Sequence, residues 1–294
     1  MNAKKIKKYY CWISVFIAVI FLIPSESNAA PIIRAMPAKV RLSILPGSSK
    51  AGSITVENPT DSDKYIKVYL EDWYYVPEAT GSKDFKPAGT DELSCAPWIS
   101  FVPAEFKLAP YSKQYINYSV KVPEGATGGH YAILFIENTA PQTETNSEGI
   151  GLSLAIRIAS LFYIEPEGTI KRAADLTNLK VEKSDKAGMS ISLDFKNTGN
   201  VDLTVGGSFN LMDKKGMVIA RGEFNDIYTF PAGTATLSAE WKDALAKGKY
   251  DLILTIDLGK ALEEVNMGRG PIIVKEAEIE IGNSGRITNV GQMR

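Results

Sequence analysis

A strand–turn–strand pattern with asparagine in the turn is written twice in this chain. In the first copy, the alternating segment 53–57 leads through an Asn-rich turn at 58–61 into the alternating segment 65–70. Residues 190–205 repeat this order, with Asn-Thr-Gly-Asn as the turn. Alternation of apolar and polar residues is the period of a β-strand, and Asn and Gly tolerate the left-handed backbone of tight turns. The chain is therefore expected to contain two copies of one β-sheet unit.

Each copy continues with a tyrosine that opens a late apolar strand, two residues after a glycine. Tyr131 follows Gly129 in the first copy, and Tyr250 follows Gly248 in the second. A tyrosine at this place resembles the tyrosine corner of immunoglobulin-like sandwiches, whose hydroxyl bonds the backbone a few residues upstream. Short strands separated by turn signals, with few helical periods, are typical of sandwiches. The predicted fold is all-β, with two tandem immunoglobulin-like β-sandwich domains.

The first 29 residues have the pattern of an export signal. A basic start at 4–8 precedes an apolar core at 12–23, and small residues at 27–29 suit cleavage. Pro24, Ser25 and Glu26 stop the apolar core before it reaches the roughly 20 residues of a membrane span. We therefore expect 1–29 to be a cleaved signal peptide, with an uncleaved anchor as the alternative. The expected location is the periplasm, or else the cell surface.

Proline and glycine at 165–168 mark the expected boundary between the two domains. The first domain is expected at 30–166 and the second at 167–281, each close to the roughly 100–150 residues of a typical domain. Residues 282–294 are polar and without periodicity, and are expected to form a disordered tail. An insertion at 76–94, rich in Gly, Pro, Lys and Asp, is expected to be a mobile loop.

Composition narrows the classes of partner. Removal of the leader's four lysines and one glutamate leaves 29 Lys and Arg against 33 Asp and Glu, a net charge of −4. This balance does not favour nucleic acid or an anionic membrane as partner. Cys95 is then the one cysteine, which excludes a disulfide within the chain. We interpret Cys95 as a small buried side chain, with a reactive thiol or an intermolecular bridge as alternatives.

The sequence lacks the residue sets that common catalytic sites need. His130 is the one histidine, which excludes a two-histidine metal site and disfavours a Ser-His-Asp triad. We interpret His130 as a partly exposed turn residue. Residues 125–129 are glycine-rich but lack the Lys-Ser/Thr of a phosphate loop. Glu71 and Asp72 are neighbours on a strand and would point to opposite faces, which does not suit glycoside hydrolysis. The prediction is a protein that is not an enzyme and uses no metal or small-molecule cofactor.

The apolar run at 150–164 is the segment that most suggests a function. Apolar side chains recur at every second position from 150 to 158, a period of two over roughly twice the average strand length of about 5–6 residues. Beyond Ser160 the alternation shifts by one residue, which predicts a β-bulge. A long apolar strand at a sheet edge must be covered, or it serves as a docking site for another strand.

Several segments of the first domain match one known pattern in order. They are 37–40 with the turn Leu-Pro-Gly at 45–47, 54–59, 97–103, 106–110, and Arg157 followed by Leu-Phe-Tyr at 161–163. Over roughly 35–166 the chain resembles the amino-terminal domain of the periplasmic pilus-assembly chaperones, the PapD-like family. The second domain is only generically immunoglobulin-like.

The resemblance implies a chaperone-like protein that binds pilus or other envelope proteins. In that family the last long strand of the first domain donates apolar side chains to an incomplete pilus subunit, a form of β-strand addition. Two basic residues hold the subunit's terminal carboxylate, a charge-assisted contact. The resemblance implies a partner-binding strand at Ile150, Leu152, Leu154 and Ile156, and a carboxylate clamp at Lys39 and Arg157.

Two other interpretations of the chain stay open. One is a non-enzymatic cell-surface adhesion or cell-wall-binding module, in which loops and the aromatic patch at 73–75 contact a cell-wall polymer. We expect Trp73 to be packed in a core and an exposed tyrosine of this patch to be available to an interface. The other is purely structural, with 150–164 as an interior strand covered by its own sheet and by the second domain.

Overall fold

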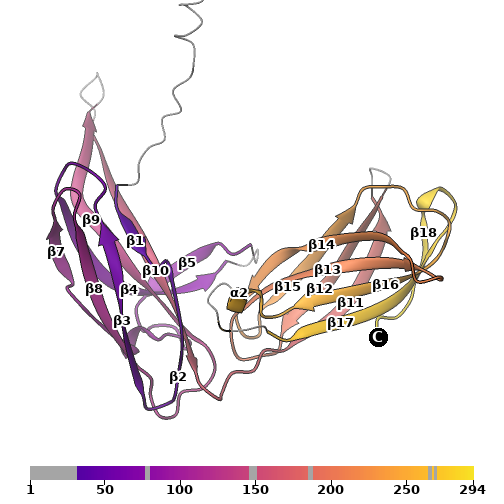
Figure 1. Cartoon of the computed structure of the whole chain (residues 1–294), viewed down its shortest axis with the longest axis horizontal. Helices are drawn as coiled ribbons and strands as arrows, with labels where there is room; N and C mark the ends of the chain where they lie inside the picture. Colours follow the sequence, from indigo (N-terminus) through magenta and orange to yellow (C-terminus); the bar gives the residue numbers. More distant parts are fainter. Residues whose placement is uncertain (1–31, 77–79, 146–150, 185–187, 264–266, 268–269) are drawn as a thin grey trace, which may run out of the picture. The chain divides into compact units, whose positions relative to one another are not determined.

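A computed structural model describes residues 32–76, 80–145, 151–184, 188–263, 267 and 270–294. The predicted leader, residues 1–29, lies outside these residues. Ile33–Arg294 form one compact unit, in which four β-sheets pack as two sandwiches, and the predicted all-β fold is confirmed (Figure 1). In the described part of the chain, no helix combines the length and the apolar character needed to span a bilayer.

The first sandwich is built from strands β1 to β10. One sheet has the order β1-β3-β8-β6, and the other has the order β2-β10-β9-β4-β5 with β7 also paired to β4. The strands are β1 (Arg34–Met36), β2 (Lys39–Ile44), β3 (Ser49–Glu57), β4 (Lys64–Tyr75), β5 (Lys83–Pro87), β6 (Ile99–Val102), β7 (Glu105–Leu108), β8 (Lys113–Lys121), β9 (His130–Thr145) and β10 (Gly151–Pro166). A 3-10 helix, η1 (Ala96–Trp98), precedes β6.

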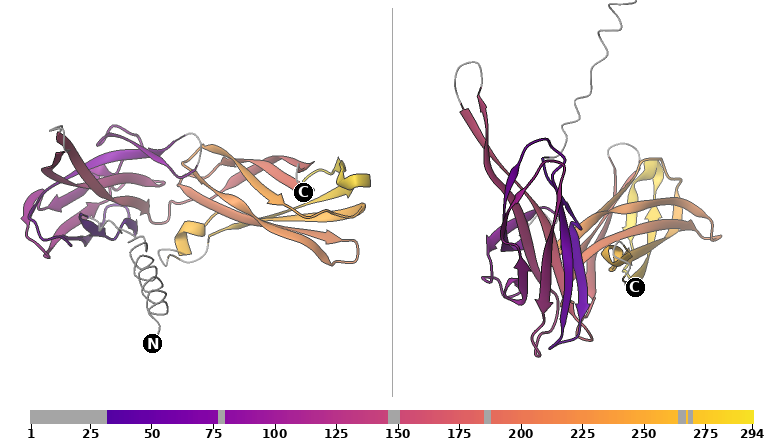
Figure 2. Two further views of the ribbon diagram at one scale, coloured as in Figure 1. Left: turned by 90° about the horizontal axis from the view of Figure 1, so that it is seen from above. Right: turned by 60° about the vertical axis from the view of Figure 1, so that its left-hand side comes forward.

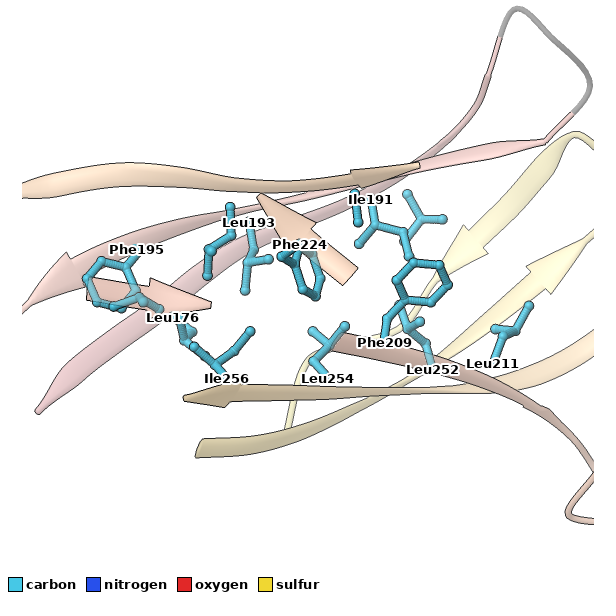
Figure 3. Packing of buried hydrophobic residues seen from close by; sticks show 14 of the residues in the cluster. Leu176, Ile191, Leu193, Phe195, Phe209, Leu211, Phe224, Leu252, Leu254 and Ile256 are labelled. Carbon is cyan, nitrogen blue, oxygen red and sulfur yellow. The ribbon is translucent and has the colours of Figure 1, made fainter. Parts of the chain in front are cut away.

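The second sandwich repeats the two-layer plan with sheets of order β11-β12-β15 and β14-β13-β16-β17-β18. Its strands are β11 (Ala174–Lys183), β12 (Met189–Asn197), β13 (Leu203–Asp213), β14 (Val218–Thr229), β15 (Thr234–Trp241), β16 (Gly248–Asp257), β17 (Ile272–Ile281) and β18 (Ile287–Val290), with the short helix α2 (Lys260–Glu263) and the 3-10 helix η2 (Asn283–Gly285). Alternate residues are buried along β12 and β16. Figure 3 shows Leu193 and Phe195 of β12 packed between the layers with Phe209 and Leu254.

The two asparagine turns make the same hydrogen bonds in both sandwiches. Asn58 and Asn197 are buried, at 1% and 0% exposure. The Oδ1 atom of each accepts the backbone N–H of the residue two positions later, at 3.0 and 2.9 Å. Each Nδ2 donates to the carbonyl four positions later, at 2.8 and 2.9 Å, and to a carbonyl across the sandwich, Ala109 at 3.0 Å or Phe230 at 3.1 Å. The internal repeat read from the sequence is therefore a repeat of hydrogen bonding.

The two corner tyrosines differ in what their hydroxyl groups bind. Tyr250 donates to the carbonyl of Ala246, four residues upstream, at 2.8 Å, as a tyrosine corner does. The Tyr131 hydroxyl instead accepts the backbone N–H of Asp202, in the second sandwich, at 2.6 Å. A tyrosine corner was thus predicted correctly for Tyr250 and wrongly for Tyr131, because Tyr131 lies where the two sandwiches touch.

The β-bulge predicted beyond Ser160 is absent from the described part of β10. The register between β10 and β9 is unbroken over 156–164. Phe162 points into the core of the sandwich, whereas Tyr163 packs against aromatic side chains on the opposite face of the sheet. The shift in the apolar pattern arises because both faces of β10 are covered here, and a strand buried on both faces loses its alternation.

Two segments expected to lack structure contain strands. Within 76–94, β5 pairs with β4 and extends the sheet, with Lys83 opposite Tyr75; 77–79 lie outside the described residues. Within 282–294, β18 pairs with β17, and Arg294 exchanges two backbone hydrogen bonds of 3.0 Å with Glu276. The tail lies along β17, and its backbone groups form hydrogen bonds with backbone groups of β17 that would otherwise be an open sheet edge.

Candidate functional site

The first half of β10 is an edge of its sheet. Strand β9 runs antiparallel to β10 along its length, whereas β2 runs parallel to it and pairs only with Leu161–Pro166. Strand β2 starts at Lys39, opposite Leu161. Among the described residues, no strand pairs with 151–160 on the side that β2 leaves open. Figures 1 and 2 show β9 and β10 projecting together beyond their neighbours in the first sandwich.

The backbone of β10 points hydrogen-bonding groups toward this open side. The N–H of Leu161 donates to the carbonyl of Ala38 at 2.9 Å, on the β2 side. Successive residues of a strand direct their N–H and C=O groups to alternate sides, so Ala159 and Arg157 direct theirs to the β2 side as well. Arg157 and Ala159 precede the part of β10 that pairs with β2, so their backbone groups are placed to pair with an added strand.

The predicted partner-binding positions are described to different extents. Ile150 lies outside the described residues. Leu152 and Leu154 belong to β10 by their backbone, which pairs with β9, and their side chains lie outside the description. Ile156 is half-buried, as is Ile158, so both retain apolar surface at the open edge. The register between β10 and β9 is irregular between Leu154 and Ile156.

Arg157 is held on the face of the sheet turned away from the sandwich core. Its guanidinium lies 3.9 Å from the ring centre of Phe135, and Nη1 lies 3.5 Å from Glu71 Oε1. Nη1 also donates to the Tyr69 hydroxyl at 3.3 Å. The hydrogen bond to Tyr69 is the main cause that raises the pKa of Arg157 above its ordinary value. Arg157 thus has a carboxylate, a hydroxyl and a ring as partners within its own sheet.

The predicted clamp residues, Lys39 and Arg157, are separated along the strand direction of the sheet. Lys39 is exposed and lies opposite Leu161, and Arg157 lies four positions earlier on β10. At about 3.3 Å per residue, their backbones are separated by about 13 Å along the strand direction. Because the Arg157 guanidinium turns to Glu71 and Tyr69, the described contacts do not bring the two cations together on one ligand.

Sequence reasoning missed a buried ionic cluster that contains Arg41. Arg41 lies 2.5 Å from Glu165 and 2.7 Å from Asp202, and Arg172 lies 2.6 Å from Glu165. The side chain of Arg41 is 5% exposed and lies over the ring of Tyr163 at 4.3 Å. Burial alone would lower the pKa of Arg41, but Asp202 and Glu165 outweigh it and raise the pKa. The cluster joins β2 and β10 to the start of the second sandwich.

Aromatic side chains from both sandwiches pack beside this ionic cluster. Trp73 is 2% exposed, as expected of a core residue, and lies 5.3 Å from the ring of Tyr163. Phe230 of the second sandwich stacks on Tyr131 at 4.4 Å, and Tyr228 lies 5.7 Å from Tyr75. Aromatic pairs in this distance range stabilise beyond their burial. The patch at 73–75 is thus largely used in contacts within the chain.

Cys95 and His130 occupy structural positions. Cys95 is fully buried, and burial raises the pKa of its thiol, as fits the interpretation of a small core side chain. The ring of His130 lies 4.2 Å from that of Trp98, and burial lowers the pKa of His130. In the described residues, no group of three or more His, Cys, Asp and Glu side chains is arranged to hold a metal ion.

No family model and no curated protein matches the sequence. Among solved structures, the class 5 fimbrial chaperone CfaA is similar, with a TM-score of 0.46 and 15% identity over 82% of this chain and 98% of CfaA. A chaperone–tip adhesin complex of CFA/I fimbriae has a TM-score of 0.45 and 16% identity, over 82% of this chain and 97% of the matched chain. The CupB2 chaperone of Pseudomonas aeruginosa has a TM-score of 0.41 and 13% identity, over 83% of this chain and 98% of CupB2. Each of these three structures contains a chaperone, in the second case together with a tip adhesin.

Proposed function

We propose that this protein is an exported, periplasmic chaperone-like protein that binds a pilus subunit or another envelope protein by β-strand addition along the first half of β10. The observation that carries the proposal is the edge of β10 left open before Leu161, because β2 begins only at Lys39. Edge strands of natural proteins are usually short, covered or charged, because an open edge invites pairing. Here the edge is long and apolar, which suits a strand that is meant to be paired by a partner.

The side chains of the edge support the same proposal. Ile156 and Ile158 are half-buried, and Leu152 and Leu154 continue their period of two in the sequence. In β-strand addition, main-chain hydrogen bonds supply affinity and alternate side chains fill pockets of the partner. The carboxylate clamp at Lys39 and Arg157, expected from the resemblance, stays a prediction; in the structure, Arg157 contacts Glu71 and Tyr69 of its own sheet.

Amide hydrogen exchange, read by NMR on the protein alone and with a co-expressed candidate subunit, tests the edge directly. The amides of Arg157 and Ala159 point to the open side and should exchange quickly in the free protein, then become protected in the complex. The amides of Ile158 and Ser160 point to β9 and should be protected in both states. Unchanged exchange at Arg157 and Ala159 in a stable complex would show that the partner binds elsewhere.

A paired substitution tests whether the apolar side chains are donated. Leu152→Glu together with Leu154→Glu should abolish capture of the subunit while the circular dichroism spectrum is retained. The matched control is Ile272→Glu with Val274→Glu on β17, where both side chains are exposed at 54% and 61%; this variant should capture normally. If the β10 variant is folded and still captures, strand donation is wrong. Binding to purified cell-wall polymer in place of protein would favour the adhesion module instead.

A further inference from the structure

The sheet of order β1-β3-β8-β6 has an outward face whose middle carries no charged side chain. Strand β8 pairs with β3 on one side and with β6 on the other, so the outward residues of the three strands form rows across the sheet. These residues, called the uncharged face below, are Ala51, Ser53 and Thr55 of β3, Tyr115, Asn117 and Ser119 of β8, and Ser100 and Val102 of β6. Charged residues begin in the rows beyond them, with Glu57 opposite Lys113 at one end and Lys121 at the other.

A shallow hollow of about 340 Å³ lies on this face, lined by the paired segments 100–102 and 117–119. Hydroxyl and amide groups line it, and apolar side chains stand at its rim. Val102 is 62% exposed, and Tyr115, the next outward residue of β8, is 54% exposed. Small-molecule sites have volumes of roughly 300–1,000 Å³ and combine apolar or aromatic side chains with a few uncharged polar groups. The hollow matches that composition at the lower end of that size range.

The second sandwich repeats this layer in β12 and β15, which correspond to β3 and β8 when the two asparagine turns are aligned. Thr55, Tyr115 and Ser119 of the first sandwich then correspond to Asp194, Thr236 and Glu240 of the second. The second copy thus has two carboxylates where the first has none, and it has no aromatic ring at the place of Tyr115. The fold of the layer therefore requires neither the lack of charge nor the exposed tyrosine of the first copy.

The polar side chains of the two layers also differ in their partners. Asp194 accepts a hydrogen bond from Asn178 at 3.0 Å. Ser238, which is at the position of Asn117, donates its hydroxyl to Asn225 at 2.9 Å. In the described part of the chain, the side chain of Asn117 makes no hydrogen bond. Its amide can donate and accept at the same time, so it is available to the hydroxyl groups of a ligand.

The size and the chemistry of the uncharged face favour a small neutral ligand over a protein. Three strands about 4.8 Å apart and three rows about 7 Å apart give a surface of about 300 Å². A stable protein interface buries about 800 Å² on each partner, and its core is rich in aromatic residues, Met and Arg. The face also lacks the cations that bind phosphate groups of nucleic acids or lipids.

We infer that the uncharged face binds an uncharged saccharide chain. One sugar packs its apolar C–H face on the ring of Tyr115, and the next places its hydroxyl groups in the hollow, within reach of Asn117. A sugar ring has an apolar face and a rim of neutral hydroxyl groups, so it complements an aromatic plane that adjoins uncharged donors and acceptors. The site does not depend on strand addition, because β10 belongs to the other sheet of the sandwich.

NMR of the ¹⁵N-labelled full chain tests the site without a partner protein. The probes are the neutral tetrasaccharides cellotetraose, maltotetraose and tetra-N-acetylchitotetraose, with tetragalacturonic acid as the charged control. The side-chain amide signal of Asn117, assigned by its loss in Asn117→Ala, should shift on addition of a neutral probe. The galacturonic acid probe should bind more weakly than the neutral probe, because the face has no cation to pair with its carboxylates.

Substitution of the tyrosine measures its part in binding. Tyr115→Ala should weaken binding by about three- to tenfold, the range of an aromatic contact, and Tyr115→Phe should bind as the unaltered chain does. Two controls should leave binding unchanged. They are Tyr65→Ala, which removes a tyrosine that is equally exposed but lies in the other sheet, and Thr236→Ala, at the corresponding position of the second sandwich.

Three results would overturn the inference. One is that no neutral tetrasaccharide shifts the Asn117 signal at its highest soluble concentration. Another is that Tyr65→Ala weakens binding as much as Tyr115→Ala. The third is that the Asn117 signal shifts when the protein alone is concentrated, since a second copy of the chain would then cover the face. The variant Leu152→Glu with Leu154→Glu should lose subunit capture and keep saccharide binding, so the two proposals fail or stand separately.

Discussion

Replacement of Arg41 by methionine should be one of the most destabilising single changes in the described part of this chain. Methionine retains much of the apolar stem of arginine but removes the charge that two buried carboxylates share. Glu165 keeps Arg172 as a partner, whereas Asp202, at 1% side-chain exposure, loses its cation. Removal of one partner from a buried ion pair costs about 3–5 kcal/mol, because a charge is left in a poorly hydrated site.

Thermal unfolding of the full chain, followed by circular dichroism at pH 7, measures this cost. For domains of this size, about 1 kcal/mol lowers the unfolding temperature by roughly 2–4 °C. The expected decrease for Arg41→Met is therefore about 6–20 °C. The double variant Arg41→Met with Asp202→Leu should recover part of this loss, because replacing both partners by apolar groups is often neutral. With the single variant Asp202→Leu, the double-mutant cycle is complete and gives the coupling energy of the pair.

Lys214 provides a matched control, since it also bridges two carboxylates. Its ammonium lies 2.6 Å from Asp251 and 2.8 Å from Glu278, but its side chain is 46% exposed. Exposed ion pairs contribute about 0–1 kcal/mol, so Lys214→Met should lower the unfolding temperature by only a few degrees at most. If Arg41→Met were no more destabilising than Lys214→Met, the argument that burial makes the Arg41 cluster important would be refuted.

Three further predictions follow from single residues. Asn58→Ala and Asn197→Ala should each lower the free energy of unfolding, measured in urea, by about 1–3 kcal/mol, because each leaves buried carbonyls unpaired; a neutral result in either copy would contradict the shared role. Gly129→Ala should destabilise, since a Cβ there would clash with the Tyr131 hydroxyl, whereas a Cβ at Gly125 meets nothing within 4 Å, so Gly125→Ala should be nearly neutral. Similar unfolding temperatures of the two variants would refute this. Burial lowers the pKa of His130 in the folded state below its ordinary 6.5, so the unfolded chain binds the proton more readily and stability falls as pH decreases through 6.5. His130→Gln should flatten that part of the stability–pH curve between pH 7.5 and 5.5, and a parallel curve for this variant would contradict the assignment.

Features that depend on near neighbours in the sequence were predictable. The period of two and the asparagine turns gave the all-β fold, and the hydrogen bonds of Asn58 and Asn197 join mostly residues two and four positions apart. The Tyr250 corner spans four residues. These hydrogen bonds join residues that are close in the sequence, so they can be predicted from the order and spacing of residue types.

Features that depend on distant strands were not predictable from the pattern. The loss of alternation after Ser160 had the same appearance in sequence as a bulge, and only the second covered face of β10 explains it. The contacts of Arg157 with Tyr69 and Glu71, on β4, join residues that are 88 and 86 positions apart, so the residues around Arg157 in the sequence do not predict them.

By itself, the sequence determined most of the strands and turns, although not β5 and β18, and it showed that they form a twice-repeated unit and that one long apolar strand needs cover. The tertiary structure decided which half of that strand is covered, because β2 pairs only with Leu161–Pro166. It also decided which charges are buried: Arg41 meets Glu165 across 124 positions and Asp202 across 161. Chain folding brings such residues together through pairings between strands, and no local spacing encodes which strands will be neighbours.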